Sequence, residues 1–296
     1  MRTSILLLFL TLACSILACK PKTTMNELYH QISDTLARQN GVFAVAFRDL
    51  ATGESLLINA GQPFHAASTM KTPVMIEVYK QAAAGKFSLD DSMTIRNEFK
   101  SIVDGSTYSL DAADDSEQGL YAQVGQKRKL SDLVYDMIIV SSNLATNLVI
   151  ELVDPRQVTA TVHDLGAPDT QVLRGVEDQK AFDKGLNNVT TAQDMMTLFV
   201  QIAQGKAVSP QASEDMTRIL LDQKFNEIIP ARLPAEVRVA HKTGSITGVR
   251  HDCGIVFLPD GHKYVLALLS KDMTDEEAGI RAMAAVSAMI YAHVTQ

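Results

Sequence analysis

Three short strings decide how this chain is interpreted: Ser68-Thr69-Met70-Lys71, Ser141-Ser142-Asn143 and Lys242-Thr243-Gly244-Ser245. They read S-x-x-K, S-x-N and K-T-G, and each pattern occurs once in the 296 residues. An S-x-x-K string alone is expected about once by chance in a chain of this length. Because all three occur in this order and at wide intervals, we treat them as parts of one site.

The first string places a serine and a lysine one helical turn apart. At this spacing Ser68 and Lys71 lie on one face of a helix, within reach of each other. A serine hydroxyl needs a nearby base to act as a nucleophile, and a lysine serves when burial lowers its pKa. Without the other two strings, a helix-capping serine followed by a solvent-exposed lysine would be the preferred interpretation.

Together, the strings are typical of penicillin-recognising serine enzymes, and the chain resembles class A β-lactamases and class-A-like penicillin-binding proteins. The resemblance covers essentially the whole chain after its N-terminal segment. It implies a serine hydrolase that opens β-lactam rings through an acyl-enzyme on Ser68, with no cofactor. An H-x-H-x-D string is absent, which argues against a zinc β-lactamase and predicts no metal site.

The resemblance also implies roles for the second string. Ser141 would relay a proton to the leaving nitrogen of the substrate, and Asn143 would bind the substrate amide. Ser142 stands where the family more often has an aspartate with a supporting role. The substitution therefore concerns the support of the site more than its chemistry.

The third string would bind the negatively charged parts of the substrate. Lys242 would stabilise the substrate carboxylate and tune the proton of the relay serine, while Thr243 and Ser245 would offer hydroxyl groups to the same carboxylate. Gly244 would let the substrate backbone approach closely. The N–H groups of Ser68 and Ser245 would form an oxyanion hole, which stabilises the charge that develops during acylation.

The residues after this string are less clearly assigned. The family often has an arginine here that assists carboxylate binding, but its usual strand position holds Cys253, so Arg250 is a candidate substitute. His251 and Asp252 are expected to form a structural hydrogen-bonded pair. Cys253 is the only cysteine beyond the N-terminal segment, so we expect a buried thiol and no intrachain disulfide.

Turnover of the acyl-enzyme depends on the loop 174–188. Class A enzymes carry a glutamate on this loop that activates the hydrolytic water, with an asparagine four residues later. Aligned on Arg174, the candidate Glu177 stands one position late, and Ala181 occupies the place of the asparagine. The aspartate that usually closes the loop appears as Asn188.

Three functions remain open at this point. If Glu177 reaches the water, the protein hydrolyses β-lactams, which we favour because the chain is a compact catalytic unit. If Glu177 instead caps the loop or pairs with Arg174, the protein would be a penicillin-binding D-Ala-D-Ala carboxypeptidase, acting on peptidoglycan stem peptides, with slow β-lactam deacylation. A non-catalytic β-lactam sensor is a further alternative, but sensors usually carry a transmembrane signalling segment.

The pattern of apolar residues predicts an α+β fold, and the resemblance implies that it is of the β-lactamase/transpeptidase type. An antiparallel sheet, flanked by terminal helices over 25–36 and 274–293, would be formed by both ends of the chain. The expected strands are 42–47, 55–59, 237–241, 253–258 and 264–270. An α/β lobe would comprise about 23–65 and 225–296, and an all-α lobe about 66–224.

The segment 99–129 is polar and turn-rich, and we interpret it as a surface insertion near the cleft. It contains four acidic residues: Asp111, Asp114, Asp115 and Glu117. Such a cluster is most often a solvated loop, and a role in substrate entry is the alternative.

Composition excludes some functions and the N-terminus predicts a destination. The net charge of −7 and the absence of a long basic run argue against nucleic-acid binding. Residues 1–18 resemble a lipoprotein signal peptide, with Cys19 as the lipidated first residue of a membrane-anchored, periplasmic protein. An ordinary secretory signal with an incidental cysteine is the alternative. We expect a monomer whose partners are a small β-lactam or a stem peptide.

Overall fold

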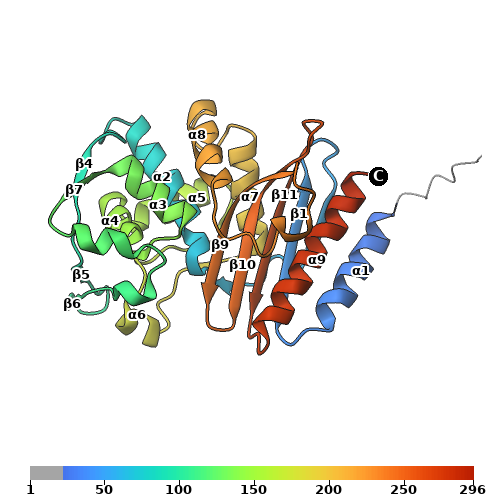
Figure 1. Ribbon diagram of the computed structural model, residues 1–296, viewed down its shortest axis with the longest axis horizontal. Helices are drawn as coiled ribbons and strands as arrows, with labels where there is room; N and C mark the ends of the chain where they lie inside the picture. The colour runs from blue at the N-terminus through green and yellow to red at the C-terminus, as the bar shows by residue number, and fades with distance from the viewer. Residues whose placement is uncertain (1–22) are drawn as a thin grey trace, which may run out of the picture.

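The computed structural model describes residues 23–296, so the predicted signal segment and Cys19 lie outside the described residues. Its centre is a five-stranded antiparallel sheet with the strand order β2-β1-β11-β10-β9 (Figure 1). The strands are β1 (Val42–Asp49), β2 (Ser55–Ile58), β9 (Arg238–Ile246), β10 (Val249–Phe257) and β11 (Lys263–Lys271). The predicted sheet, formed by both ends of the chain, is therefore confirmed.

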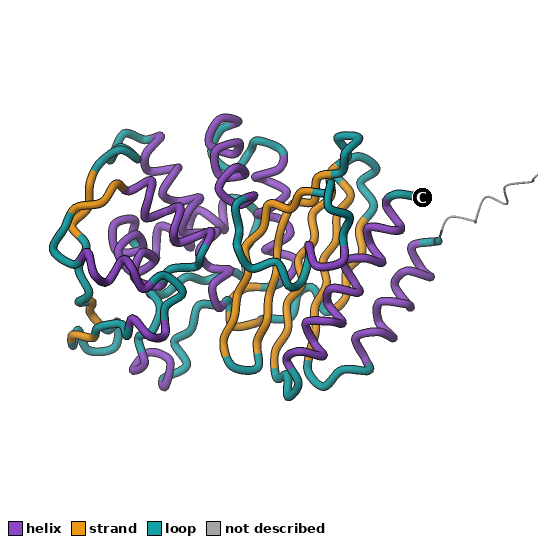
Figure 2. The backbone as a smooth tube through the Cα atoms, viewed as in Figure 1, coloured by secondary structure: helices purple, strands orange, loops and turns teal. Residues whose placement is uncertain are grey.

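Helices cover both faces of this sheet (Figure 2). The terminal helices α1 (Met25–Ala37) and α9 (Glu276–Val294) flank the sheet, as predicted; they lie side by side on one face, and α7 (Ala192–Ala203) packs on the other. Because neither face meets water, the strands are buried at almost every position instead of alternating. Each face therefore has its own hydrophobic core, and the core beneath α7 continues into the helical part of the molecule.

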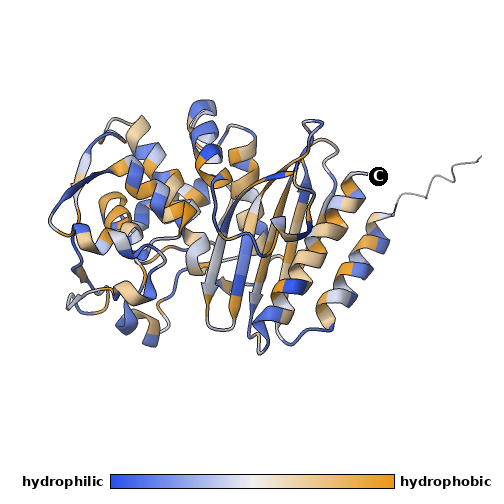
Figure 3. Cartoon of the chain, viewed as in Figure 1, coloured by the Kyte–Doolittle hydropathy of each residue, from blue (hydrophilic) through white to orange (hydrophobic). Residues whose placement is uncertain are grey.

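The chain between β2 and β9 is mainly helical, and its apolar positions are visible along the helices in Figure 3. The further α-helices are α2 (Lys71–Ala83), α3 (Leu130–Ile139), α4 (Asn143–Val153), α5 (Pro155–Asp164), α6 (Gln179–Asp183) and α8 (Pro210–Leu221). Short strand pairs join β3 (Phe64–His65) to β8 (Val189–Thr190), β4 (Ser92–Thr94) to β7 (Lys127–Lys129), and β5 (Phe99–Lys100) to β6 (Thr107–Tyr108). The 3₁₀ turns are η1 (Ala67–Met70), η2 (Ala112–Asp114), η3 (Gln118–Gln123) and η4 (Pro230–Arg232). Over residues 23–296, the helices are too short or too polar to cross a membrane.

The third string lies within a strand and not at its end, which corrects the shorter strand predicted over 237–241. Strand β9 continues to Ile246, and β10 begins at Val249, so only two residues form the turn between them. Gly248 in this turn has a φ of 71°, a conformation that glycine adopts without strain. The tight hairpin keeps the whole string Lys242-Thr243-Gly244-Ser245 extended along one sheet edge.

The segment 99–129 lies at the surface near the cleft, as expected, but the solvated loop expected for its acidic cluster is found only in part, since Asp111 and Asp114 are exposed. Its apolar residues Phe99, Leu110 and Leu120 are buried in the core shared with the helices. The acidic cluster does not share one environment, since Asp115 is only 5% exposed. The segment is therefore packed onto the helical part of the molecule and forms part of its surface near the cleft.

Candidate active site

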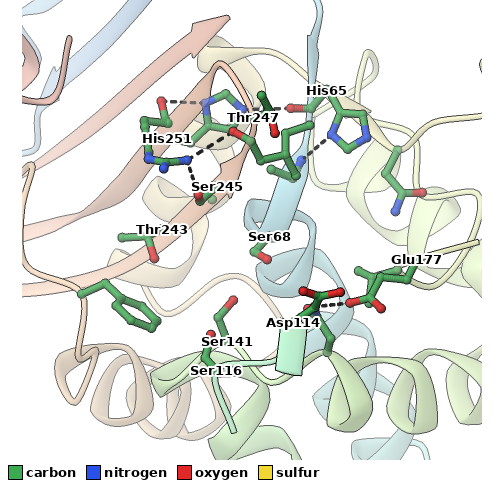
Figure 4. Close-up of a pocket in the computed structure, with 18 of the residues that line it drawn as sticks. His65, Ser68, Asp114, Ser116, Ser141, Glu177, Thr243, Ser245, Thr247 and His251 are labelled. Carbon is green, nitrogen blue, oxygen red and sulfur yellow. Dashed lines mark hydrogen bonds between the residues drawn. The ribbon is translucent and has the colours of Figure 1, made fainter. Parts of the chain in front are cut away.

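All three strings and the loop 174–188 line one cleft of about 1030 Å³. Ser68, Ser141, Glu177, Thr243 and Ser245 lie around the same opening in Figure 4. The helical elements supply one side of it, and strand β9 supplies the other. The juxtaposition that the sequence predicted for these residues is thus present in the structure.

Lys71 is fully buried at the start of α2, directly after the 3₁₀ turn that contains Ser68. Its Nζ donates hydrogen bonds to the backbone oxygen of Ser141 at 2.7 Å, to Ser141 Oγ at 3.1 Å and to Asn143 Oδ1 at 2.9 Å. Burial lowers the pKa of Lys71 to about 7, and the negative charges of Asp115 and Glu177 act against this shift. Near neutral pH, a substantial fraction of this amine is therefore unprotonated and able to act as a base.

Ser141 joins the two buried lysines. Its Oγ lies 3.0 Å from Lys242 Nζ as well as 3.1 Å from Lys71 Nζ. Burial, and then the charge of Lys71, hold the pKa of Lys242 well below its ordinary value. A hydroxyl oxygen that accepts from an amine on each side directs its own proton elsewhere. This arrangement suits a group that passes a proton between Lys71 and a molecule in the cleft.

Gly244 brings strand β9 against the turn that carries Ser68. A Cβ atom at this position would lie 3.2 Å from each of three atoms: the backbone nitrogen of Ser68, the Cβ of Ala67 and the Cγ2 of Thr69. The glycine is therefore needed for close packing between strand and turn, in addition to the expected approach of a substrate. The packing sets the position of Ser68 relative to Ser245, whose N–H groups we expect to form the oxyanion hole.

Glu177 lines the cleft. It neither caps the loop nor pairs with Arg174, which are the two structural roles considered for it above. Its Oε1 accepts a hydrogen bond of 2.6 Å from Asn143 Nδ2, and burial raises its pKa. The helix-capping role belongs to Asp178, whose carboxylate accepts from the backbone N–H of Ala181 at 3.1 Å. The guanidinium of Arg174 is bonded within the loop and not to Glu177.

Asn188 closes the loop 174–188 through the backbone. Its Oδ1 accepts from the N–H groups of Leu173 at 2.8 Å and Arg174 at 3.2 Å, and its Nδ2 donates to the oxygen of Arg174 at 3.0 Å. An amide can both accept and donate, which a carboxylate cannot. Asn188 thus holds the two ends of the loop together without an ion pair.

Arg250 lies at the cleft, opposite Ser245 in the sheet register. It donates to Ser245 Oγ and forms an ion pair of 2.5 Å with Glu276 at the start of α9. Cys253 is opposite Lys242 and fully buried, as expected for a structural thiol. Arg250 therefore places its positive charge beside the third string. The strand position where the family often has an arginine instead holds the buried thiol of Cys253.

The expected pair of His251 and Asp252 is wrong. Asp252 accepts instead from His241 Nδ1 at 2.7 Å, while His251 Nε2 lies 2.9 Å from the backbone oxygen of His65. Adjacent residues in a strand point to opposite faces of the sheet, so sequence neighbours within β10 cannot pair in this way. The hydrogen bond between His241 and Asp252 links β9 to β10 instead.

Some residues of the cleft carried no signal in the sequence. His65 and Phe182 are in edge contact at a ring-centroid distance of 6.2 Å, and both line the cleft beside the loop 174–188. Phe225 and Ile228 line it from the segment before β9. The strained Ala67, with a φ of 44°, was also unforeseen. None belongs to a short pattern, so only the fold reveals them.

Comparisons with known proteins agree with this geometry. The profile described as "Beta-lactamase enzyme family" matches residues 27–294. A "Beta-lactamase" of Bacteroides uniformis is 27% identical, covering 90% of this chain and 91% of that protein. The fold and the match over nearly the whole described chain place it among serine β-lactamases and their penicillin-binding relatives. This chain belongs to the β-lactamase enzyme family.

Solved structures from both sides of this superfamily are similar to the chain. The crystal structure of a β-lactamase from Sphaerobacter thermophilus DSM 20745 matches with a TM-score of 0.78 and 28% identity, covering 90% of this chain and 98% of that one. A mutant of PBP-A, in an acyl-enzyme complex with penicillin G, matches with a TM-score of 0.80 and 27% identity, covering 93% of this chain and 99% of that one. The fold is thus common to a β-lactamase and to a penicillin-binding protein, and the site must distinguish them.

Proposed function

We propose that the protein is a class A-like serine β-lactamase. The observation that carries this proposal is the position of Glu177, which faces the cleft and is bonded to Asn143 at 2.6 Å instead of serving the structure of its own loop. Burial raises the pKa of this carboxylate, which makes it a stronger base once it is ionised. It is therefore suited to activate a water for deacylation.

In the acylation step, neutral Lys71 takes the proton of the Ser68 hydroxyl, and Ser68 Oγ forms a bond to the lactam carbonyl carbon. The N–H groups of Ser68 and Ser245 stabilise the oxyanion. As the lactam C–N bond breaks, Ser141 donates its proton to the nitrogen and recovers one from Lys71. The hydrogen bonds from both lysines to Ser141 support this route.

In the deacylation step, Glu177 takes a proton from water, whose oxygen attacks the ester carbon. The bond to Ser68 breaks, and the proton held by Glu177 passes to Ser68 Oγ, which restores both the Ser68 hydroxyl and the Glu177 carboxylate. Lys242, Thr243 and Arg250 bind the carboxylate of the substrate during both steps, and Asn143 binds its amide. The only reactants are the β-lactam and water.

A chromogenic cephalosporin tests the proposal directly. We expect the wild type to hydrolyse it, and Glu177→Gln to slow turnover by about 10²–10⁴-fold while the acyl-enzyme on Ser68 accumulates in mass spectra. The matched control is Asp183→Asn, because Asp183 lies in the same loop and, among residues 23–296, its carboxylate bonds only to Gln179 at 2.7 Å. Stable labelling of the wild type by a penicillin, without turnover, would refute the β-lactamase.

A D-Ala-D-Ala carboxypeptidase is the second candidate, favoured by one observation. Ala181, four residues after Glu177, is a buried apolar residue that offers no side-chain amide to hold a water. Slow deacylation would then leave peptidoglycan stem peptides as the natural substrate. Release of D-alanine from a peptide ending in D-Ala-D-Ala, with stable penicillin labelling, would establish this alternative.

We also propose that Cys19 carries a lipid anchor and that the enzyme works in the periplasm. The string Ile16-Leu17-Ala18-Cys19 supports this. Mass spectrometry of the N-terminus of the protein from membranes is the test. A Cys19→Ala variant that remains in the membrane fraction would contradict it.

A further inference from the structure

A buried carboxylate from the segment 99–129 is bonded to the start of helix α4. Asp115 Oδ2 accepts hydrogen bonds of 2.9 Å from the backbone N–H groups of Asn143 and Leu144, and of 2.9 Å from the hydroxyl of Tyr121. The hydroxyl of Ser142 lies 3.5 Å from the same oxygen. Among the acidic cluster of this segment, Asp115 is the buried member, and it lies against the loop 141–143.

Helix α4 needs this carboxylate because its own cap is incomplete. The first N–H groups of a helix have no partner inside it, and the side chain of Ser142 accepts only from Ala145 N, at 3.2 Å. The N–H groups of Asn143 and Leu144 are those that Asp115 satisfies. A negative charge at this end also stabilises the helix dipole.

The same loop holds the groups that bind Lys71. Ser141 has a φ of 57°, which a non-glycine residue keeps only when its surroundings hold it there. Both its oxygens and Asn143 Oδ1 accept from Lys71 Nζ. Any movement at the start of α4 would therefore displace the partners of the base.

We propose that Asp115 is a positioning residue for acylation, which fixes the loop 141–143 and thereby the environment of Lys71. This inference rests on the proposed function, since it assigns a role within the same acylation step. Its neighbours Asp114 and Ser116 line the cleft (Figure 4), so the carboxylate also ties this wall of the cleft to the catalytic loop. The side chain of Asp115 thus links the part of the cleft wall formed by Asp114 and Ser116 to the loop that binds the base, Lys71.

Asp115→Asn is the main test, because the amide keeps the shape and removes the charge. We expect the second-order rate constant for acylation by a fluorescent penicillin to fall by about 10–100-fold, since hydrogen bonds to charged groups are the strong ones. The charges that face Lys71 are Asp115, Glu177 and Lys242. Removing one negative charge favours the neutral amine, so the acid limb of the acylation profile should move to lower pH.

Asp111→Asn is the matched control. It removes the same charge from the same segment, but Asp111 is exposed, and within the described part of the chain its side chain bonds only to the nearby N–H of Ala113 at 2.9 Å. Its rate and profile should stay at wild-type values. If Asp115→Asn does not fold, Tyr121→Phe replaces it: losing the 2.9 Å bond to Asp115 should slow acylation by about 2–5-fold.

The outcomes separate the two proposals. If the wild type forms no acyl-enzyme, the proposed function fails. If the wild type is acylated and Asp115→Asn reacts at an unchanged rate, the role of Asp115 fails alone. Slower acylation with an unmoved pH profile and a lower melting temperature would also overturn it, because a helix cap without influence on Lys71 behaves in that way. An unchanged rate in Tyr121→Phe would overturn it where that variant is the one tested.

Discussion

Gly244→Ala would separate the strand that carries the third string from the turn that carries Ser68. The added Cβ would lie 3.2 Å from Ser68 N, from Ala67 Cβ and from Thr69 Cγ2, closer than nine in ten real contacts of this kind. Two of these neighbours are backbone or Cβ atoms of the turn, so neither can rotate away. The strand and the turn must therefore separate by a few tenths of an ångström.

That displacement would change the distance between the two N–H groups of the proposed oxyanion hole, because one belongs to Ser68 and the other to Ser245. If one donor is lost to the oxyanion, acylation should slow by about 10²–10³-fold, which corresponds to about 2.7–4 kcal/mol of transition-state stabilisation. The loss should appear in the acylation rate constant measured with a fluorescent penicillin. Thermal melting should be recorded in parallel, so that unfolding is not mistaken for a catalytic effect.

Gly61→Ala is the matched control, because a Cβ at Gly61 would meet nothing within 4 Å. It should leave acylation unchanged, since the same glycine-to-alanine change is made away from the cleft. A folded Gly244→Ala variant that is acylated within about threefold of the wild-type rate would refute the reasoning. The close approach of β9 would then have no bearing on the oxyanion hole.

Three further perturbations test other parts of the site. Acylation should become faster as the pH rises through about 7 and level off above it, because the neutral form of Lys71 is the base; a rate that is flat between about pH 5 and 9 would contradict this. Ser141→Ala should slow acylation by about 10²–10⁴-fold in a folded protein, as measured with the fluorescent penicillin, because it removes the proton relay. Asn188→Ala should lower the free energy of unfolding in urea by about 1–3 kcal/mol, because it leaves the N–H groups of Leu173 and Arg174 without their partner; unchanged stability would show that water replaces the amide.

The sequence alone was sufficient to locate those parts of the candidate site that lie in short strings. The spacing of Ser68 and Lys71 predicted a shared helical face; the structure places Ser68 in the 3₁₀ turn η1 and Lys71 at the first position of α2, which follows it directly. The terminal strands and helices were equally readable, because long apolar runs bounded by turn residues have few alternatives. These features depend on local spacing, which a single sequence contains.

The features that were missed depend on contacts between distant parts of the chain. Asp115 sits in a polar stretch, and nothing nearby distinguishes it from Asp111 or Asp114; its partner Asn143 is 28 residues away. His241 and Asp252 face each other only because the β9–β10 hairpin sets their register. A hydrogen bond between distant residues leaves no pattern in either segment, so burial of a polar residue cannot be read from its neighbours.

Strained backbone conformations at three residues of the cleft explain why several hydrogen bonds are needed to hold it. Among residues 23–296, Ala67, Ser141 and Glu177 each have a positive φ, of 44°, 57° and 61°, and all three line the cleft. Such conformations cost about 1–3 kcal/mol each and persist only where the surroundings determine them. At Ser141 the surroundings include both lysines and the cap of α4 by Asp115; at Glu177 they include Asn143. Because Asn143 takes part in both sets of contacts, the acylation loop and the deacylation carboxylate are held by one connected network.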